Sequence, residues 1–218
     1  MEKMWNELSE LIRSHYEAKT NNDLSFKVQC KNRSIIIKER KYLTFIIENP
    51  ECDNDKEDEY KFIESIEFDN DNKKYAIAIG FNPAKAESHE FDLTNKKLIY
   101  HLSDNYSGYF LFNLYPLISK DKKAFYETPV TLEYESVILK ELLMKIDGID
   151  TIIFWGRTTK VNDDLLDLMV NNSSDLYLTI SKSSTKHVHP AYTPYDDIEI
   201  QRFSSSRRVR NEISYIEW

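Results

Sequence analysis

The chain has 218 residues, of which 41 % are hydrophobic and 13 % aromatic, so it is long and apolar enough for one domain with a sizeable core. Only 4 residues are glycine, and this composition excludes collagen-like, low-complexity and mainly disordered chains. Cys30 and Cys52 do not make a disulfide framework, and no apolar run approaches the roughly 20 residues of a membrane helix. We therefore expect a soluble cytoplasmic protein.

The net charge of −8 comes from one acidic segment. Residues 48–72 hold eleven acidic side chains and two lysines, so the remainder of the chain sums to +1. The C-terminal part carries a local basic excess, which a phosphate-binding face requires but an ordinary solvated surface also shows. The acidic total therefore does not exclude nucleic acid as a partner.

The first 73 residues have the pattern of a helix followed by a β-meander. Hydrophobic residues at three- and four-residue steps predict an amphipathic helix over residues 2–19. Short β-type runs follow at residues 25–31, 34–38 and 42–48, with turns expected at Asn32-Arg33 and Arg40-Lys41. The remaining expectations here are a polar acidic loop at residues 49–58, a strand or short helix at 60–68 and a turn at 69–72.

From Tyr75 onward, apolar runs of strand length alternate with helical patterns. The apolar runs cover residues 75–79, 109–114, 151–155 and 176–180, and the helical patterns cover residues 95–103, 132–146 and 161–170. Buried strands that alternate with helices predict a parallel sheet covered on both faces. We expect the α/β class, as a three-layer α/β/α sandwich with a mostly parallel central sheet over residues 74–218. Residues 1–73 would precede it as an extension, whose meander either continues the sheet or forms a separate domain.

Four short motifs lie at the ends of the four apolar runs or after them. They are Gly80-Phe81-Asn82-Pro83, Asn113-Leu-Tyr-Pro116, Trp155-Gly156-Arg157 and His187-Val-His189-Pro190. Ligands of open parallel sheets bind outside the carboxyl ends of the strands. We therefore expect polar residues of all four motifs to converge on one cleft.

The order of these motifs resembles the uracil-DNA glycosylase superfamily. There, a Gly-x-Asn/Asp-Pro motif follows the first central strand, an asparagine ends a Gly-x-x-x-x-Asn run, an apolar strand ends in Trp-Gly, and a His-Pro motif comes last. This chain has the corresponding residues in the same order, as Gly80-Phe-Asn82-Pro83, Gly108-Tyr-Phe-Leu-Phe-Asn113, Trp155-Gly156 and His189-Pro190. The same set also looks like a bacterial and phage family long catalogued only as a domain of unknown function.

Two departures from the superfamily pattern argue against uracil as the substrate. The Asp-Pro-Tyr first motif of the uracil enzymes is replaced by Asn82-Pro83, which is closer to the mismatch-specific branch. Their His-Pro-Ser-Pro motif reads His189-Pro190-Ala191-Tyr192 here. Because some antiviral members attack modified bases in phage DNA, the resemblance implies a DNA glycosylase that flips out and excises a modified base, such as a hydroxymethylated or glucosylated cytosine.

The resemblance also implies roles for individual residues. Asn82 would orient the attacking water, and His189 would donate a hydrogen bond to the base oxygen that gains charge. Asn113 would read a pyrimidine edge, and Phe81 or Phe91 would stack on the flipped base beside Gly80. The residues that would contact DNA are Lys85, Arg157, Lys182, Ser183, Ser184, Lys186, His187 and Tyr192, the last as a wedge in the vacated stack.

Simpler interpretations of the same residues remain open. Asp92 would be a general base or a helix cap with Thr94, and Lys85 a Schiff-base lysine or a phosphate-facing one. His187 and His189 have the spacing of two metal ligands, but no partner Cys or carboxylate cluster is convincingly spaced. The mechanism requires no metal or organic cofactor, and we expect a monomer. The alternative functions are a non-catalytic nucleic-acid-binding module and a hydrolase of nucleosides or nucleotides.

Overall fold

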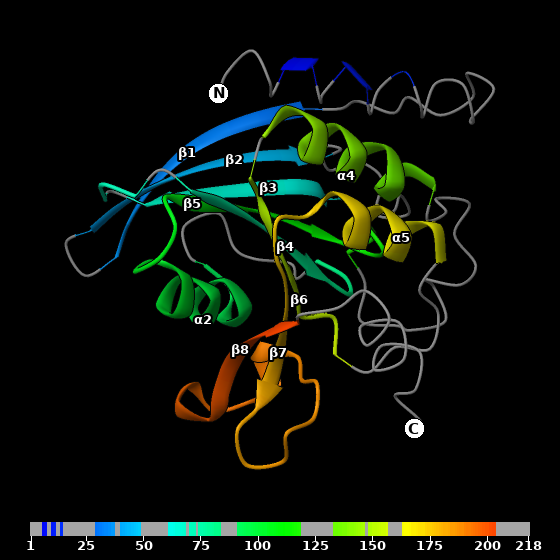
Figure 1. Ribbon diagram of the computed structural model, residues 1–218. Helices are drawn as coiled ribbons and strands as arrows, with labels where there is room; N and C mark the ends of the chain where they lie inside the picture. The colour runs from blue at the N-terminus through cyan, green and yellow to red at the C-terminus, as the bar shows by residue number, and fades with distance from the viewer. Residues whose placement is uncertain are drawn as a thin grey trace.

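The structure, a computed structural model, describes residues 29–37, 40–48, 61–68, 70–72, 74–83, 91–118, 133–146, 148–156 and 163–203, with Asn6, Glu7, Glu10, Leu11 and Ser14. The described strands form one eight-stranded sheet in the order β1-β2-β3-β5-β4-β6-β7-β8 (Figure 1). The strands are β1 (Gln29–Ile37), β2 (Arg40–Glu48), β3 (Lys61–Phe68), β4 (Tyr75–Gly80), β5 (Gly108–Asn113), β6 (Asp150–Ile153), β7 (Leu176–Ser181) and β8 (Ile198–Phe203). The helices are α2 (Leu93–Leu102), α4 (Glu133–Lys145) and α5 (Asp163–Asn172), with two 3-10 turns, η1 (Pro190–Tyr192) and η2 (Tyr195–Asp197).

The sheet is mixed, with a parallel centre and antiparallel margins. Strands β5, β4, β6 and β7 run parallel to one another, as the apolar runs predicted. The meander β1-β2-β3 joins β5 through an antiparallel pairing, and β8 pairs antiparallel with β7. The α/β class is confirmed, and the described sheet of residues 74–218 is mostly parallel, with β8 as its antiparallel strand. The meander continues the sheet across the predicted boundary at residue 73.

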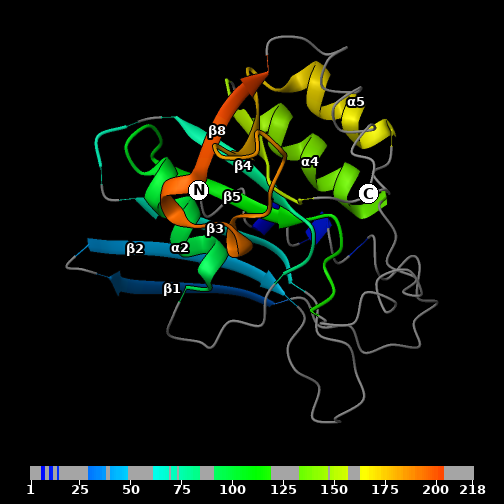
Figure 2. The ribbon, with the colours of Figure 1, turned by 90° about the horizontal axis from the view of Figure 1, so that it is seen from below.

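Helices cover both faces of the sheet, because successive side chains of each strand point to opposite faces. On one face, Ile77 and Ile79 of β4 share a hydrophobic core with α4 and α5. On the other face, Ala76 and Ala78 share a core with α2. Figures 1 and 2 show α4 and α5 together on one side and α2 on the other. Among the described helices, none is long and apolar enough to cross a bilayer.

Two details of the meander differ from the expectation. Asn32 and Arg33 form no turn; they lie within β1 and pair with Phe45 and Thr44 of β2. Polar residues are tolerated inside such a strand, since a margin of an antiparallel sheet can face water on one side. The hairpin closes on the pair between Ile37 and Arg40, so the expected Arg40-Lys41 turn already belongs to β2.

Other expectations are met in part or lie outside the described residues. Residues 61–68 are a strand, which settles the ambiguity between strand and helix. The five described N-terminal residues are helical, but most of the predicted helix over residues 2–19 and the whole loop at residues 49–58 lie outside the described residues. Strand β8 was not predicted.

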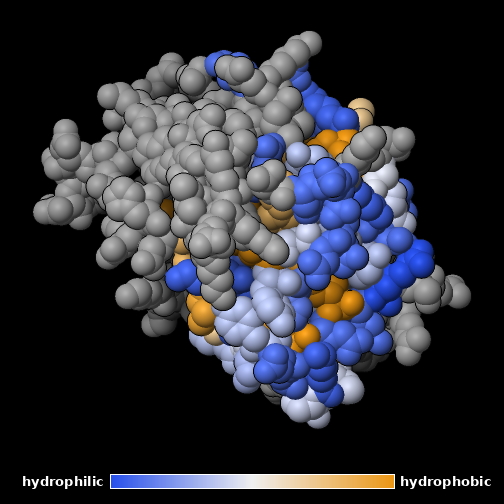
Figure 3. Space-filling view, turned by 90° about the vertical axis from the view of Figure 1, so that its left-hand side faces the viewer, coloured by the Kyte–Doolittle hydropathy of each residue, from blue (hydrophilic) through white to orange (hydrophobic). Residues whose placement is uncertain are grey.

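On the side seen in Figure 3, the described surface is mainly hydrophilic, with small hydrophobic patches.

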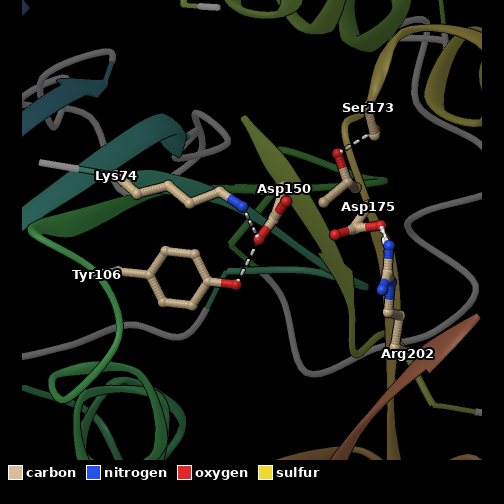
Figure 4. Close-up of polar contacts among 7 residues, drawn as sticks. Lys74, Tyr106, Asp150, Ser173, Asp175 and Arg202 are labelled. Atoms are coloured by element: carbon tan, nitrogen blue, oxygen red, sulfur yellow. Dashed lines mark hydrogen bonds and ion pairs between the residues drawn. The ribbon is translucent and has the colours of Figure 1, made fainter. Parts of the chain in front are cut away.

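A buried carboxylate fixes the amino end of β6 (Figure 4). Asp150 is 1 % exposed, and its Oδ2 accepts a hydrogen bond of 2.7 Å from the Tyr106 hydroxyl. The Lys74 ammonium lies 2.7 Å from the same oxygen. Burial, together with the bond to Asp150, raises the pKa of Tyr106, so the phenol stays a donor. Nearby, Arg202 of β8 pairs with Asp175 at the solvent-exposed surface.

We expect Asp150→Asn to lower the free energy of unfolding by about 1–3 kcal/mol. The neutral amide would lose the ion pair with Lys74 and would accept a weaker hydrogen bond from the Tyr106 hydroxyl. Asp175→Asn is the matched control, since its partner Arg202 is 64 % exposed. Such a surface pair contributes less than about 1 kcal/mol. Urea denaturation of both variants measures the difference, and equal losses would contradict this account.

Candidate functional site

The carboxyl end of β4 has no space for a side chain at Gly80. A Cβ there would meet Oδ1 of Asn113 and would come within 2.7 Å and 2.8 Å of two ring atoms of Phe154. Asn113 pairs with Gly80 across the β4–β5 ladder, and Phe154 follows β6 on the opposite side of β4. Residues of the first two motifs and Phe154, which directly precedes the third, therefore meet over the end of β4. We call Gly80, Asn82, Asn113, Phe154 and His189 the strand-end site.

The topology explains why this end of the sheet is suited to a ligand. From β4 the chain passes to β5 on one side and then returns to β6 on the other side. Such a reversal of strand order leaves a crevice between the loops that leave the two central strands. Here those loops begin with Phe81-Asn82 after β4 and with Phe154-Trp155-Gly156 after β6.

The fourth motif reaches the same place through Gly156. This residue has a φ of 73°, in the left-handed region that favours glycine, and its Cβ position lies 3.1 Å from Cβ of His189. The His189 imidazole packs edge-on against Phe154, with ring centroids 5.7 Å apart. His189 therefore joins Asn113 around one aromatic ring, as the strand-end argument predicted.

The hydrogen bonds of His189 define its protonation state. Nδ1 accepts from the backbone N–H of Ala191 at 3.2 Å, so the proton of the neutral ring resides on Nε2. Burial, with smaller contributions from His187 and Lys97, lowers the pKa of His189 to about 4. At neutral pH the ring is consequently an uncharged donor through Nε2–H.

The two asparagines of the site differ in their surroundings. Asn113 is 5 % exposed, and among the described residues none hydrogen-bonds to its side chain. A buried amide without such a partner is a candidate for binding a ligand, because leaving it unpaired costs about 1–3 kcal/mol. Asn82 is half-buried, and its Nδ2 donates to the carbonyl of Pro83 at 3.3 Å.

The two phenylalanines expected to stack on a base lie in different surroundings. Phe91 is 3 % exposed and belongs to the core beneath α2. Phe81 is half-buried and packs against Tyr115 at a centroid distance of 5.2 Å. Phe81 is thus the more accessible of the two.

Asp92 has a structural contact. Its Oδ1 accepts from the backbone N–H of Asn95 at 2.7 Å and so caps the N-terminus of α2. This is the capping contact that the sequence offered as an alternative to a catalytic base.

The residues expected to hold phosphates are partly engaged within the protein. Asp197 accepts hydrogen bonds from the hydroxyl of Ser181 and from both the amide and hydroxyl of Ser183, and these bonds lower the pKa of Asp197. Ser184 N–H donates to Ser181, and Lys182 donates to the carbonyl of Asp196. Lys186 is exposed, whereas Lys85 and Arg157 lie outside the described residues.

His187 and Tyr192 have opposite exposures. His187 is only 7 % exposed; its Nδ1 donates to the carbonyl of Thr179, and its ring packs edge-on against Trp155. This burial does not fit the surface contact with DNA that the sequence predicted for His187. Tyr192 is 90 % exposed, and its ring lies 5.5 Å from that of His189. It therefore projects from the rim of the strand-end site.

Lys97 is a residue that the sequence analysis missed. It lies on α2 and is 5 % exposed, yet its neighbours Lys96 and Leu98 gave no signal of a buried cation. Its ammonium donates to the carbonyls of Pro190 and Thr193, directly after His189. Burial lowers the pKa of Lys97.

Fold and site together define an α/β protein with a polar and aromatic site at the carboxyl ends of its central strands. A family model, described as "Protein of unknown function (DUF1643)", matches residues 64–191. The chain belongs to this family.

Comparison with individual proteins adds little to this assignment. Among curated proteins, none matches the chain. One solved structure, acetyl xylan esterase 1 from Thermoanaerobacterium sp. JW/SL YS485, is 11 % identical, and the match covers 78 % of this chain and 54 % of that chain. Our chain thus spans about half the length of that esterase. The TM-score is 0.37, which carries no argument about fold or function.

We expect Gly156→Ala to destabilise the protein more than Gly148→Ala. Both glycines have a positive φ, of 73° and 71°, so both alanines carry a backbone strain of about 1–2 kcal/mol. The nearest atom to a Cβ at Gly148 is 3.8 Å away, whereas a Cβ at Gly156 crowds His189. Urea denaturation compares the two losses, and the imidazole NMR signals of His189 should move only in Gly156→Ala. Equal losses with an unmoved His189 would contradict the contact.

Proposed function

We propose that the protein is a DNA glycosylase that flips out a modified base and hydrolyses its bond to the sugar. The observation that supports this most is the meeting of Asn113, Phe154 and His189 around the ends of β4 and β6. Asn113 and His189 belong to the motifs whose order resembles the uracil-DNA glycosylase superfamily, and Phe154 directly precedes the Trp155-Gly156 motif. Membership of a family of unknown function leaves this activity open.

The proposed reaction breaks the N-glycosidic bond and leaves its electron pair on the base. The sugar carbon gains positive charge and bonds to the oxygen of a water molecule; that water loses a proton to the solvent and the base anion gains one from it, so the products are the free base and an abasic site. Asn82 follows β4 and would orient this water through its amide. Asn113 offers an amide donor and an acceptor to the edge of the flipped base.

His189 would stabilise the departing base. Its Nε2–H is a neutral donor, held in place by the bond from Ala191 to Nδ1. A donor fixed before the reaction stabilises developing negative charge without reorganisation, and removing one such donor typically costs about 10²–10³-fold in rate.

The narrower proposal names the substrate as a bulky modified cytosine of phage DNA, either hydroxymethylated or glucosylated. The replaced Asp-Pro-Tyr and His-Pro-Ser-Pro motifs support a base other than uracil. The exposed Tyr192 beside His189 is placed to enter the base stack that the flipped nucleotide vacates. The protein would act in the cytoplasm as a defence against phage, because abasic sites block replication of the phage genome.

The first test is an assay for abasic sites. We expect the purified protein to create alkali-sensitive breaks in phage DNA that carries modified cytosine and to leave unmodified DNA intact. Asn82→Ala and His189→Asn should each lower the rate by about 10²–10³-fold. Asn172→Ala is the control, because Asn172 is exposed on α5 and, within the part of the chain that the structure describes, its side chain bonds only to its own helix at Leu168.

Two other outcomes would replace the proposal. DNA binding without breaks would indicate a nucleic-acid-binding module. Release of the base from free nucleosides, with no action on DNA, would indicate a small-molecule hydrolase.

The pH profile of the excision rate is a separate test. Since the pKa of His189 is about 4, the ring is already neutral above about pH 5.5, and we expect a flat rate from there to about pH 8. Below pH 4 the ring gains a proton on Nδ1 and loses the bond from Ala191, so the rate should change there. An inflection near pH 6.5 that disappears in His189→Asn would contradict the neutral-donor role.

A further inference from the structure

We propose that Lys97 is a positioning residue, whose buried ammonium holds the turn after His189 and keeps the imidazole aimed at the strand-end site. Its effect on catalysis rests on the proposed function. Its effect on the His189 turn does not.

The contacts of Lys97 are unusually complete for a lysine. Nζ donates to the Pro190 carbonyl at 2.7 Å and to the Thr193 carbonyl, and it lies 3.5 Å from the Ala191 carbonyl. It also lies 5.2 Å from the ring centroid of Tyr195. A buried ammonium is costly unless each of its hydrogens is bonded, and here the carbonyls of one turn supply the acceptors. Lys97 therefore binds the turn as an internal cation.

The other end of this connection is fixed to the sheet. α2 is capped by Asp92, and Asn95 is buried against the sheet. Asn95 donates to Glu64 of β3 at 3.2 Å and accepts from the Tyr109 hydroxyl of β5 at 2.7 Å. Because Asn95 and Lys97 are two residues apart, they point to different sides of α2. The helix thus connects the sheet, through Asn95, to the His189 turn, through Lys97.

The charge of Lys97 acts in the same direction as its hydrogen bonds. Among the described residues, the charged and titratable groups beside His189 are Lys97 from α2, His187 from the same connection and Tyr192 from η1. A nearby cation disfavours the imidazolium. The ammonium therefore helps to keep Nδ1 free to accept from Ala191 and Nε2–H free to donate.

The test compares Lys97→Met and Lys97→Gln with the control Lys140→Met. Met removes the charge and the donors, whereas Gln removes the charge but retains two N–H donors on a side chain that is one bond shorter. Lys140 is exposed on α4, on the opposite face of the sheet, so its replacement should have no effect. A urea denaturation curve first establishes that each variant is folded, and Lys97→Gln remains the informative variant where Lys97→Met does not fold.

The main measurement is the pKa of His189, followed by NMR and assigned with His189→Asn. We expect the pKa to rise above about 4 in both Lys97 variants, only part of the way toward its ordinary value because burial is the main cause of the shift, and to stay at about 4 in Lys140→Met. We also expect hydrogen exchange of the Ala191 amide to accelerate by about tenfold or more, because that amide reports the bond to Nδ1. An unchanged His189 pKa together with an unchanged Ala191 exchange rate would overturn the proposal.

The excision rate separates this inference from the proposed function. Where the wild type excises a base, we expect kcat of Lys97→Gln to fall by about 10²-fold with little change in KM, because the donor is displaced while DNA contacts remain. An unchanged kcat would overturn the positioning role in catalysis. Where the wild type has no activity, the proposed function fails, and the His189 pKa and Ala191 exchange still decide whether Lys97 holds the turn.

Discussion

The strand-end site depends on one steric constraint, the absence of a side chain at the end of β4. Any Cβ at Gly80 would overlap Oδ1 of Asn113 and the Phe154 ring, and these two groups come from the strands on either side. Because backbone ladders fix the register of all three strands, the groups cannot both retreat without disturbing the core. Gly156 likewise leaves space for His189, because a Cβ at Gly156 would crowd that residue. Two glycines thus create the space in which the four motifs meet.

The sequence alone was sufficient to predict the central strands and to predict that polar residues gather at their carboxyl ends. Continuous apolar runs such as Tyr75–Ile79 have the length and composition of strands buried on both faces, and residues directly after such strands must lie at one edge of the sheet. The order of the strands and the place of the meander depend on pairings between distant segments, which no local pattern records. Strand β8 was not predicted, because its alternation of Ile198 and Ile200 with polar and charged residues is short.

Individual site residues were harder to predict because their partners are distant in the sequence. Ser183 was predicted to bind a phosphate, but in the structure its amide and hydroxyl both donate hydrogen bonds to Asp197. His187 and His189 are only two residues apart, yet their rings pack against different aromatic side chains, Trp155 and Phe154 respectively. The sequence could place both near the site, but it could not say which ring faces it. Lys97 resembled any solvated helix lysine, since its acceptors lie more than 90 residues away.

The electrostatics of the site favour one kind of chemistry over another. A histidine that accepts or delivers a proton works best with a pKa near the operating pH, whereas the pKa values of His187 and His189 are both about 4. Among the described residues, no carboxylate hydrogen-bonds to His189 to raise its pKa, and Lys97 acts in the opposite direction. Such a ring serves as a fixed neutral donor. A leaving group that departs as an anion, as a base does when its bond to the sugar breaks, is the partner that benefits most from that donor.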